Sequence, residues 1–445
     1  MKTGSSQIQS GDNRKTYKKI RCYLFIPATL ALLQLNSCTN NPATHTPTLA
    51  ADADNVGLVL PTGFAALKVA DSTGNARHIA VNKNGDIFIK LEEPRQGKGI
   101  VVLTDKDGDG RADGRSSFAD YGGTGIAIKN DFLYASSNTT VFRYKLDAKQ
   151  QVTDPLHPDT LVSGLIDRGQ HNSKSLTLDN NGNIYVNIGA YSNACQEKDR
   201  TKGSPGMQPC PILDSAGGIW QFKADAMHQG YGTGKRYATG LRNVVGLDWN
   251  QQTNALYVMQ HGRDNLHDFF PELYDVKQAA ELPAETMYKL SEGSDCGWPY
   301  IYYDQFQEKK MVMPEYGGDG KKEVTDKYEN PVATFPGHLA PNGLLFYTGD
   351  MFPEHYKNGA FIAFHGSWNR APEPQAGFMV AFVPFQNGVP SGKWEVFAKG
   401  FAGRENIAAP GDAAHRPCGL AQGPDGSLYV SDDKMGTIYR ITYKK

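Results

Sequence analysis

The chain has 445 residues and a formal net charge of -1 at pH 7, with 48 glycines, 25 prolines, 22 tyrosines and 20 phenylalanines. Because acidic and basic residues are mixed along the sequence, no basic stripe is present to neutralise a phosphate backbone, which argues against a nucleic-acid partner. Aromatic strand formers combined with frequent glycine and proline suit an all-β fold, and such folds often reach this length as one domain.

Residues 1–37 have the proportions of a bacterial lipoprotein signal peptide. A basic region precedes the apolar run "CYLFIPATLALLQL", which is too short to span a bilayer. The following Leu-Asn-Ser-Cys resembles a lipobox, so Cys38 is predicted to be acylated and to become the mature N-terminus; a plain secretory signal with an incidental cysteine is the alternative. Residues 38–56 then form a polar, flexible tether. We expect a protein of the bacterial cell envelope, periplasmic or outer-membrane-associated, that touches the membrane through its lipid alone.

From about residue 60 one unit recurs: an apolar strand, a turn containing Asn, Asp or Gly, and a second strand around an aromatic residue. The six copies are residues 78–91, 125–137, 175–189, 245–262, 343–367 and 419–433. Units of this kind cannot bury both faces alone, so neighbours must stack, and radial closure protects their edges. The pattern predicts a six-bladed β-propeller over residues 57–445, with the stretch near residue 64 closing the ring against the last blade. A pair of β-sandwiches is the alternative, and it fits regular hairpin units poorly.

The stretch "DKDGDGRADG" resembles a calcium-binding loop. Its carboxylates stand at positions 1, 3, 5 and 9 of an EF-hand-like spacing: Asp105, Asp107, Asp109 and Asp113. Position 12 is Ser116 instead of the glutamate that a helix-loop-helix site requires. Two interpretations remain open: a structural ion held between two strands, or a loop without any ion.

Of the cysteines beyond the signal region, Cys195 and Cys210 flank a loop rich in Gly, Pro and Lys, and they are predicted to form a disulfide in an oxidising compartment. Cys296 and Cys418 either pair or stay free, because connectivity does not follow from sequence. The chain has no Cys-x-x-Cys-His motif, so it carries no attached c-type haem.

Residues 264–340 form the largest interruption between repeats. Residues 270–290 have helix-compatible apolar spacing, and "GSDCGWPYIYYD" returns to an aromatic, turn-rich pattern. One interpretation is a flap that shapes a substrate pocket, with Trp298, Tyr300 and Tyr302 as sugar-stacking surfaces. The other is structural packing over the blade edges.

The loops that lead into the first strands of four repeats carry polar side chains in the same register. These side chains are His171, Arg242 with Asn243, His338, and Arg416. A single loop His or Arg is usually just solvated, but equivalent loops of a propeller converge near its axis, so the repetition predicts one site. Four other histidines lack a metal-ligand spacing and receive no role: His261, His267, His355 and His365.

Several motifs carry a family resemblance: "GGIWQF", "YATGLRNVVGLDWN", "LYVMQHGRDNL", "GSDCGWPY", "LLFYTGDMFPEHYKNGAFIAFHGSWNR" and "HRPCGLAQGPDGSLYVSDD". Over about residues 57–443 the chain resembles the glucose/sorbosone dehydrogenase family. The resemblance implies a six-bladed propeller that uses pyrroloquinoline quinone (PQQ) and calcium. It implies oxidation of an aldose or a sorbosone-like sugar aldehyde, with the electrons passed to a separate acceptor such as a cytochrome or a quinone.

The resemblance also implies catalytic roles. His171 matches the general base that takes a proton from a sugar hydroxyl while hydride leaves the adjacent carbon. Arg242 and Asn243 match the pair beside the reactive carbonyl of PQQ, where a guanidinium stabilises the developing oxyanion.

Further positions match the cofactor site of the family. Main-chain carbonyls of Gly262 and Arg263 match calcium ligands, although many relatives have Gly-Pro there. Arg370 and Arg416 match basic positions that hold the carboxylates of PQQ.

Two rival functions differ in class. A calcium-dependent lactonase on the same fold needs a cluster of acidic and amide ligands at the channel, whereas the loops that enter the inner strands offer His and Arg. A non-enzymatic propeller that binds carbohydrate or protein needs no base beside an Arg-Asn pair.

Overall fold

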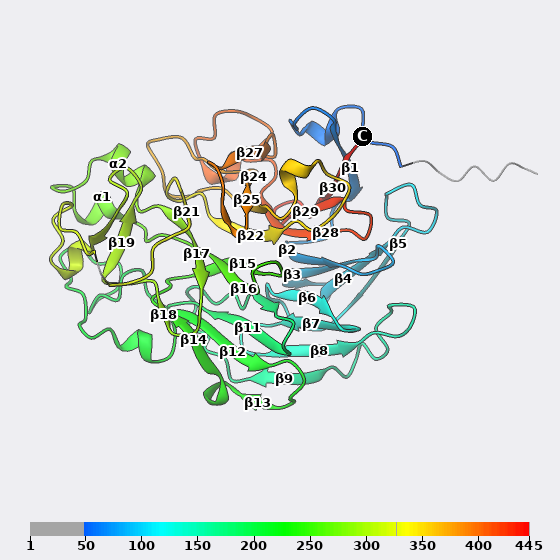
Figure 1. Cartoon of the computed structure of the whole chain (residues 1–445), viewed down its shortest axis with the longest axis horizontal. Helices are drawn as coiled ribbons and strands as arrows, with labels where there is room; N and C mark the ends of the chain where they lie inside the picture. Colours follow the sequence, from blue (N-terminus) through cyan, green and yellow to red (C-terminus); the bar gives the residue numbers. More distant parts are fainter. Residues whose placement is uncertain (1–48, 326, 445) are drawn as a thin grey trace, which may run out of the picture. The chain divides into compact units, whose positions relative to one another are not determined.

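The computed structural model describes residues 49–325 and 327–444 (Figure 1). The predicted signal peptide and the lipidation site at Cys38 lie outside these residues. Within them, no helix is long and apolar enough to cross a membrane. The end of the predicted tether is not free, because the Asp52 carboxylate accepts from the Lys68 amide (2.8 Å) and pairs with Arg111 (2.8 Å).

In this part of the chain six sheets succeed one another as blades, each starting with its innermost strand. The first blade comprises β2 (Ala76–Val81), β3 (Ile87–Arg95), β4 (Lys98–Thr104) and β5 (Gly114–Phe118). The second comprises β6 (Ile126–Lys129), β7 (Phe132–Ser136), β8 (Val141–Lys145) and β9 (Asp159–Ser163), with β13 (Gln229–Gly230) at its edge. The third comprises β10 (Leu176–Leu178), β11 (Asn183–Ile188), β12 (Gly218–Lys223), β14 (Lys235–Thr239) and β18 (Ser294–Asp295).

The second half of the ring repeats this plan. The fourth blade comprises β15 (Val244–Asn250), β16 (Ala255–Gln260), β17 (Glu285–Leu290) and β21 (Ala333–Phe335). The fifth comprises β22 (Pro341–Phe346), β23 (Ala360–Phe364), β24 (Met379–Val383) and β27 (Glu395–Ala398). The sixth comprises β28 (Pro417–Gln422), β29 (Leu428–Asp432), β30 (Ile438–Tyr443) and β1 (Phe64–Ala70).

Smaller elements decorate the blades. Two hairpins pair β19 (Ile301–Asp304) with β20 (Lys309–Val312), and β25 (Phe385–Gln386) with β26 (Val389–Pro390). The α-helices are α1 (Leu266–Phe269) and α2 (Val276–Glu281). Short 3-10 turns are η1 (Asn55–Gly57), η2 (Pro211–Asp214), η3 (Tyr231–Thr233), η4 (Pro314–Tyr316), η5 (Glu354–Tyr356) and η6 (Pro410–Asp412).

The six-bladed propeller predicted from the repeats is confirmed. The first strands of neighbouring blades contact one another in a closed ring, β2 to β6, β10, β15, β22, β28 and back to β2. The ring closes through β1, which pairs antiparallel with β30 so that Phe64 lies opposite Tyr443, as the sequence predicted. The apolar faces of the sheets need a neighbour to exclude water, and six large hydrophobic clusters lie between successive blades.

Glycines permit close packing of the inner strands. A Cβ on Gly343 would lie 2.5 Å from the Cys418 carbonyl oxygen, and one on Gly419 would lie 2.5 Å from that of Arg77. Both contacts are to backbone, which cannot move aside, so these strand starts require glycine.

The predicted insertion at about 264–340 is two insertions. Strands β17 and β21 belong to the fourth blade. Strand β17 separates a segment with α1 and α2 from a segment with the β19–β20 hairpin, and β21 follows that second segment. The helical spacing predicted for residues 270–290 holds only for α2. Pro283 lacks the amide proton that a continuing helix needs, and the β-compatible run "ETMYKL" then pairs with β16.

Candidate active site

The loops that lead into the inner strands and those that leave the second strands meet at one end of the propeller. A pocket lies there between the third, fourth and fifth blades. Its lining consists of His171, Arg200, Arg242, Asn243, His261, Gly262, Asp264, Glu285, His338, Ala340, Trp368 and Asn369. Four residues of the predicted cluster, His171, Arg242, Asn243 and His338, therefore share one pocket, although up to 167 positions (338 minus 171) separate them in the chain.

His171 is held at the pocket in a constrained conformation. Its φ is 50°, in the left-handed region, and a Cβ on the facing Gly189 would lie 2.4 Å from its carbonyl oxygen. Its Nδ1 lies 2.5 Å from the Ala190 carbonyl oxygen, which requires the proton on Nδ1 and leaves Nε2 as an acceptor. Burial, together with the positive charge of Arg242, lowers the pKa of His171 to about 3. The imidazole is thus neutral at physiological pH.

Arg242 follows β14 and precedes β15 on the floor of the pocket, and its side chain is 4% exposed. The guanidinium donates to the Asp264 carboxylate (2.7 Å), to the Gly262 carbonyl (2.8 Å) and to the Asn193 side chain (3.0 Å). Its orientation is therefore set by neighbours on three sides. The adjacent Asn243 accepts from the Asn187 amide at 3.3 Å.

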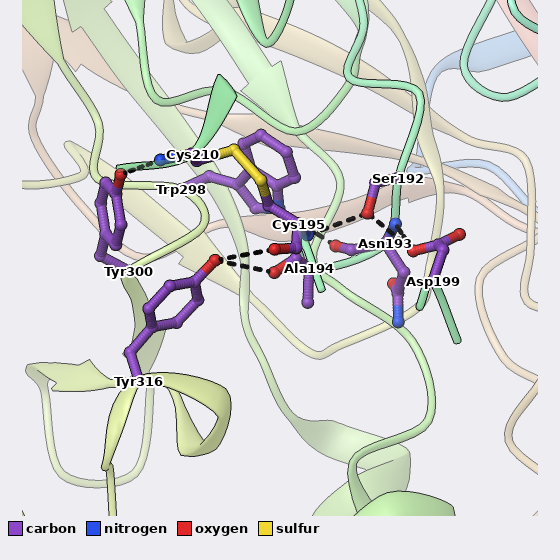
Figure 2. Close-up of a disulfide and its surroundings, with 9 residues drawn as sticks. All are labelled: Ser192, Asn193, Ala194, Cys195, Asp199, Cys210, Trp298, Tyr300 and Tyr316. Carbon is purple, nitrogen blue, oxygen red and sulfur yellow. Dashed lines mark hydrogen bonds between the residues drawn. A yellow bond between two sulfur atoms is a disulfide. The ribbon is translucent and has the colours of Figure 1, made fainter. Parts of the chain in front are cut away.

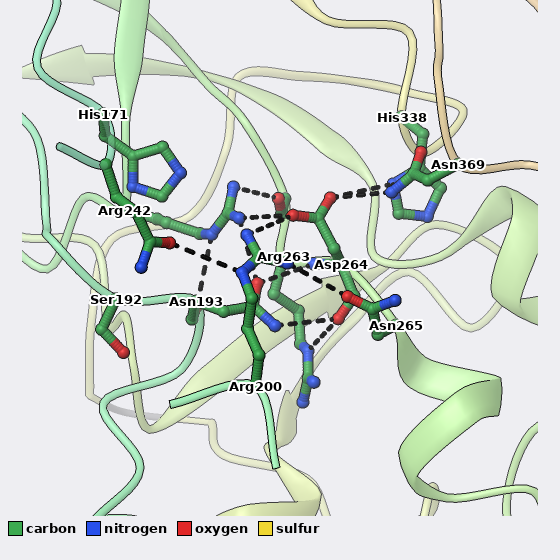
Figure 3. A network of polar contacts seen from close by, with 12 residues as sticks. His171, Ser192, Asn193, Arg200, Arg242, Arg263, Asp264, Asn265, His338 and Asn369 are labelled. Carbon is green, nitrogen blue, oxygen red and sulfur yellow. Dashed lines mark hydrogen bonds and ion pairs between the residues drawn. The ribbon is translucent and has the colours of Figure 1, made fainter. Parts of the chain in front are cut away.

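Asp264 is the centre of the polar network (Figure 3). One carboxylate oxygen accepts from both Arg242 and Arg200 (2.9 Å), and the other accepts from Asn369 (2.8 Å). Burial alone would raise the pKa of this carboxyl, but Arg242, His338 and Arg200 hold it well below its usual range. Two guanidinium ions against one carboxylate give this part of the pocket a surplus positive charge.

Two further buried groups complete the lining. Glu285, the first residue of β17, accepts from the Gly262 amide (3.0 Å), and burial raises the pKa of its carboxyl to about 8. His261 is neutral because burial, with Arg242, lowers its pKa to about 3. The His261 Nε2 and the Asn369 Oδ1 are both buried without a hydrogen-bond partner in the described structure. Both residues line the pocket, and unpaired buried polar atoms favour a bound partner there.

The sequence interpretation missed Asp264, Asn369 and Trp368 and gave His261 no role, because it compared the registers of only those loops that precede the inner strands. A signal was present in the loops after the second strands. "LYVMQHGRD" and "FIAFHGSWN" place His-Gly in the same register after β16 and β23, and these loops return to the same end of the propeller. Arg200 and Glu285 had no comparable signal.

Arg370, predicted to hold a carboxylate of PQQ, does not line this pocket. Its side chain, 8% exposed, pairs with Glu281 and donates to the carbonyls of Ala280, Gly337 and Pro374. The Arg370 cation at the end of α2 satisfies carbonyls that the short helix leaves free. The side chain therefore binds the inserted segment and not the pocket.

Arg416, the remaining member of the predicted cluster, does not line this pocket, and both Arg416 and the predicted calcium ligand Gly262 have partners within the protein. The Arg416 guanidinium donates to the carbonyls of His365 (3.1 Å), Gly366 and Ser367 (3.2 Å), so it fixes the loop that precedes Trp368. The Gly262 carbonyl already accepts from Arg242.

Arg263 is 1% exposed, does not line the pocket, and forms a buried ion pair with Glu315. A buried charged side chain requires such a partner.

The predicted stacking surfaces are corrected. Trp298 and Tyr302 are 3% and 4% exposed; the indole donates to Asn193 and the phenol bonds to Tyr274. Tyr300 lines a different cavity. The exposed aromatic ring at the pocket is Trp368, at 56%.

The disulfide between Cys195 and Cys210 forms as predicted (Figure 2), and Cys296 and Cys418 are buried free thiols.

In the acidic loop between β4 and β5, carboxylate oxygens of Asp105, Asp107 and Asp109 lie within 4.8 Å of one another. Asp113 is turned to the backbone instead, where it accepts from the Lys106 amide (2.8 Å). This loop does not line the pocket of His171.

Comparison with known proteins shows the family of this chain. The TrAA12-like family model matches residues 58–444. The chain belongs to the TrAA12-like family. This TrAA12-like protein is 29% identical over 238 residues to a PQQ-dependent pyranose dehydrogenase of Coprinopsis cinerea, a match that covers 47% of this chain and 31% of that one. The chain spans less than half the length of the curated relatives it matches. It covers 48% of an uncharacterised Borreliella burgdorferi protein and 31% of the pyranose dehydrogenase.

Solved structures share the fold. A family AA12 carbohydrate-active enzyme of Trichoderma reesei superposes with a TM-score of 0.71 at 19% identity, covering 87% of this chain and 98% of that one. The PQQ domain of the Coprinopsis cinerea pyranose dehydrogenase superposes with a TM-score of 0.64 at 20% identity, covering 89% and 98%.

Proposed function

We propose that this TrAA12-like protein is a PQQ-dependent oxidoreductase that oxidises an aldose or a sugar aldehyde and passes the electrons to a separate cytochrome or quinone. The observation that carries the proposal is the pocket itself. It places a neutral histidine with a free Nε2 beside a fixed arginine and asparagine, in a family whose relatives include a PQQ-dependent pyranose dehydrogenase.

The residues fit such a cofactor. The surplus positive charge of Arg242 and Arg200 over Asp264 suits a tricarboxylate. The unpaired Asn369 Oδ1 and the second lone pair of the Gly262 carbonyl are oxygen donors of the kind that calcium takes. When bound, PQQ supplies a quinone that accepts two electrons, and calcium increases its electrophilicity.

The side chains of this chain then have distinct tasks. The His171 Nε2 accepts the proton of a sugar hydroxyl, because the hydrogen bond of Nδ1 to Ala190 fixes the tautomer and the ring direction. The Arg242 guanidinium stabilises the negative charge that develops on the acceptor side, and it needs no reorganisation because its neighbours already orient it. The exposed ring of Trp368 offers a face on which a pyranose can stack.

The test is reconstitution. Purified apo-protein is incubated with PQQ and calcium, and aldoses and sugar aldehydes are screened with a dye as electron acceptor. Sugar-dependent dye reduction that requires PQQ supports the proposal. Hydrolysis of sugar lactones without PQQ would instead identify a calcium-dependent lactonase. The pocket contains two carboxyl groups, Asp264 and Glu285, which are ligands of the kind that such an enzyme needs. Saturable sugar binding without turnover under either condition would identify a binding propeller.

We also propose a lipid-anchored location in the bacterial cell envelope, on the lipobox that ends at Cys38. Cys38→Ser should abolish labelling by a fatty-acid probe and release the protein from the membrane fraction. Undiminished labelling and membrane association would exclude acylation at this cysteine.

A further inference from the structure

The loop closed by the Cys195–Cys210 disulfide is tied to the chain just before it. Both cysteines are buried, and their Cα atoms lie 6.2 Å apart. The Cys195 amide donates to the Ser192 hydroxyl (2.9 Å), and that hydroxyl donates to Asp199 (2.6 Å). Asp199 also accepts from the Asn193 amide at 2.9 Å (Figure 2). The disulfide, Ser192 and Asp199 therefore hold the backbone of Asn193 from one side.

Asn193 in turn contacts both charged groups of the pocket. It is fully buried, and its Oδ1 accepts from the Arg242 Nη2 (3.0 Å) and from the Asp264 amide (2.9 Å). Its Nδ2 donates to the Asp264 carbonyl (3.1 Å), and its own carbonyl accepts from the Arg242 Nε (3.2 Å). One residue thus provides two of the acceptors around Arg242 and fixes the main chain of Asp264, the counter-ion of Arg242 (Figure 3).

The same loop reaches the pocket at two other points. Arg200 pairs with Asp264 at 2.9 Å, and the second Asp199 oxygen accepts from Gln170 (2.9 Å), the neighbour of His171. The loop between the two cysteines has no regular strand or helix and a single isolated bridge, Gln196 to Gly206. Without the covalent link, its position would depend on hydrogen bonds, such as that from the Cys210 amide to Tyr300, and on the Arg200–Asp264 ion pair.

We propose that Asn193 is the positioning residue of Arg242 and that the Cys195–Cys210 disulfide holds Asn193 in place. The physical reason is pre-organisation: a guanidinium stabilises developing charge only while it points at that charge, and a long flexible side chain keeps such a direction through its partners. The site is therefore competent only while the disulfide is intact, which requires an oxidising compartment. The catalytic consequence rests on the function proposed above, whereas the positioning itself does not.

The first experiment measures the positioning in the apo-protein. The Arg242 Nε–H signal is assigned by NMR through its loss in Arg242→Lys, and its hydrogen-exchange rate is compared between variants. We expect Asn193→Ala to speed this exchange at least tenfold. The matched control is Asn183→Ala, which removes a buried asparagine bonded to Asp179 outside the pocket and should leave the exchange unchanged. An Asn193→Ala protein with the exchange rate of the parent overturns the proposal.

The second experiment tests the disulfide. Cys195→Ser combined with Cys210→Ser should speed the same exchange at least tenfold. If this variant does not fold, Asp199→Asn is used instead, because it weakens the hydrogen bonds to Ser192 and to the Asn193 amide and leaves the cysteines intact. It should also speed the exchange of the Arg242 Nε–H. Parental exchange in whichever of these variants folds overturns the role of the loop and its disulfide.

The third experiment uses reconstituted enzyme. Asn193→Ala should lower kcat about 10- to 100-fold with little change in KM. In the Arg242→Lys background, the same change should cost less than threefold, because its effect acts through Arg242. If Asn193→Ala lowers kcat by the same factor in the Arg242→Lys background as in the parent, the proposal is overturned. If the parent shows no PQQ-dependent turnover, the proposed function fails, and the exchange experiments still decide the positioning.

Discussion

His171→Gln is the sharpest test of the proposed chemistry. Glutamine can still donate to the Ala190 carbonyl, but it brings no titratable nitrogen to the position of Nε2. A positioned general base contributes about 10²–10⁴-fold. Because burial and Arg242 lower the pKa of His171 to about 3, it is a weak base, and we expect the lower half of that range. The predicted loss in kcat is about 10²–10³-fold, or about 3–4 kcal/mol of transition-state stabilisation.

The assay is steady-state dye reduction by protein reconstituted with PQQ and calcium, with PQQ affinity measured separately by titration. His355→Gln, which changes an exposed histidine paired with Glu395, is the matched control and should keep parental activity. The pH profile gives an independent check. A histidine with a lowered pKa stays neutral down to about pH 3, so kcat/KM of the parent should show no acid limb near 6.5 that belongs to His171. A His171→Gln enzyme that binds PQQ and turns over within threefold of the parent would refute the reasoning.

Three further predictions concern other groups. Arg416→Ala should weaken PQQ binding to calcium-loaded apo-protein, because the loop before Trp368 loses its fixed position; an unchanged Kd in a fluorescence titration would contradict this. Glu315→Gln leaves the buried guanidinium of Arg263 without its counter-charge and should lower the free energy of unfolding in urea by about 3–5 kcal/mol, a loss below 1 kcal/mol being the contrary result. Burial lowers the pKa of Lys90 from 10.5 to about 7, so between these pH values the unfolded chain binds a proton that the folded chain lacks. The free energy of unfolding should therefore rise between pH 7 and 10.5 by up to roughly 4 kcal/mol more in the parent than in Lys90→Met. Parallel plots of this free energy against pH for the two proteins would be evidence against a neutral Lys90.

The sequence by itself determined the architecture and the core of the site. Strand periodicity and turn residues are local properties that can be read from the sequence. Six copies of one such unit bury their apolar faces by stacking radially into a closed ring, so the blades and the closing strand β1 were predictable. The same repetition predicted that His171, Arg242, Asn243, His338 and Arg416 converge, since equivalent loops of stacked units must end near one axis, and the first four of these line one pocket.

Only the tertiary structure decided what each side chain contacts. Arg370 lies two positions from Trp368, yet the first is buried against α2 and the second is exposed at the pocket. Trp298 sits in a motif that suggests sugar stacking, but its ring is buried and its indole bonds to Asn193.

The contacts and the protonation of Asp264 and Glu285 could not be predicted from the sequence for the same reason. The direction and the protonation of a buried polar group depend on the partners and the water exclusion that distant segments supply, and neither is encoded in the spacing of its own neighbours.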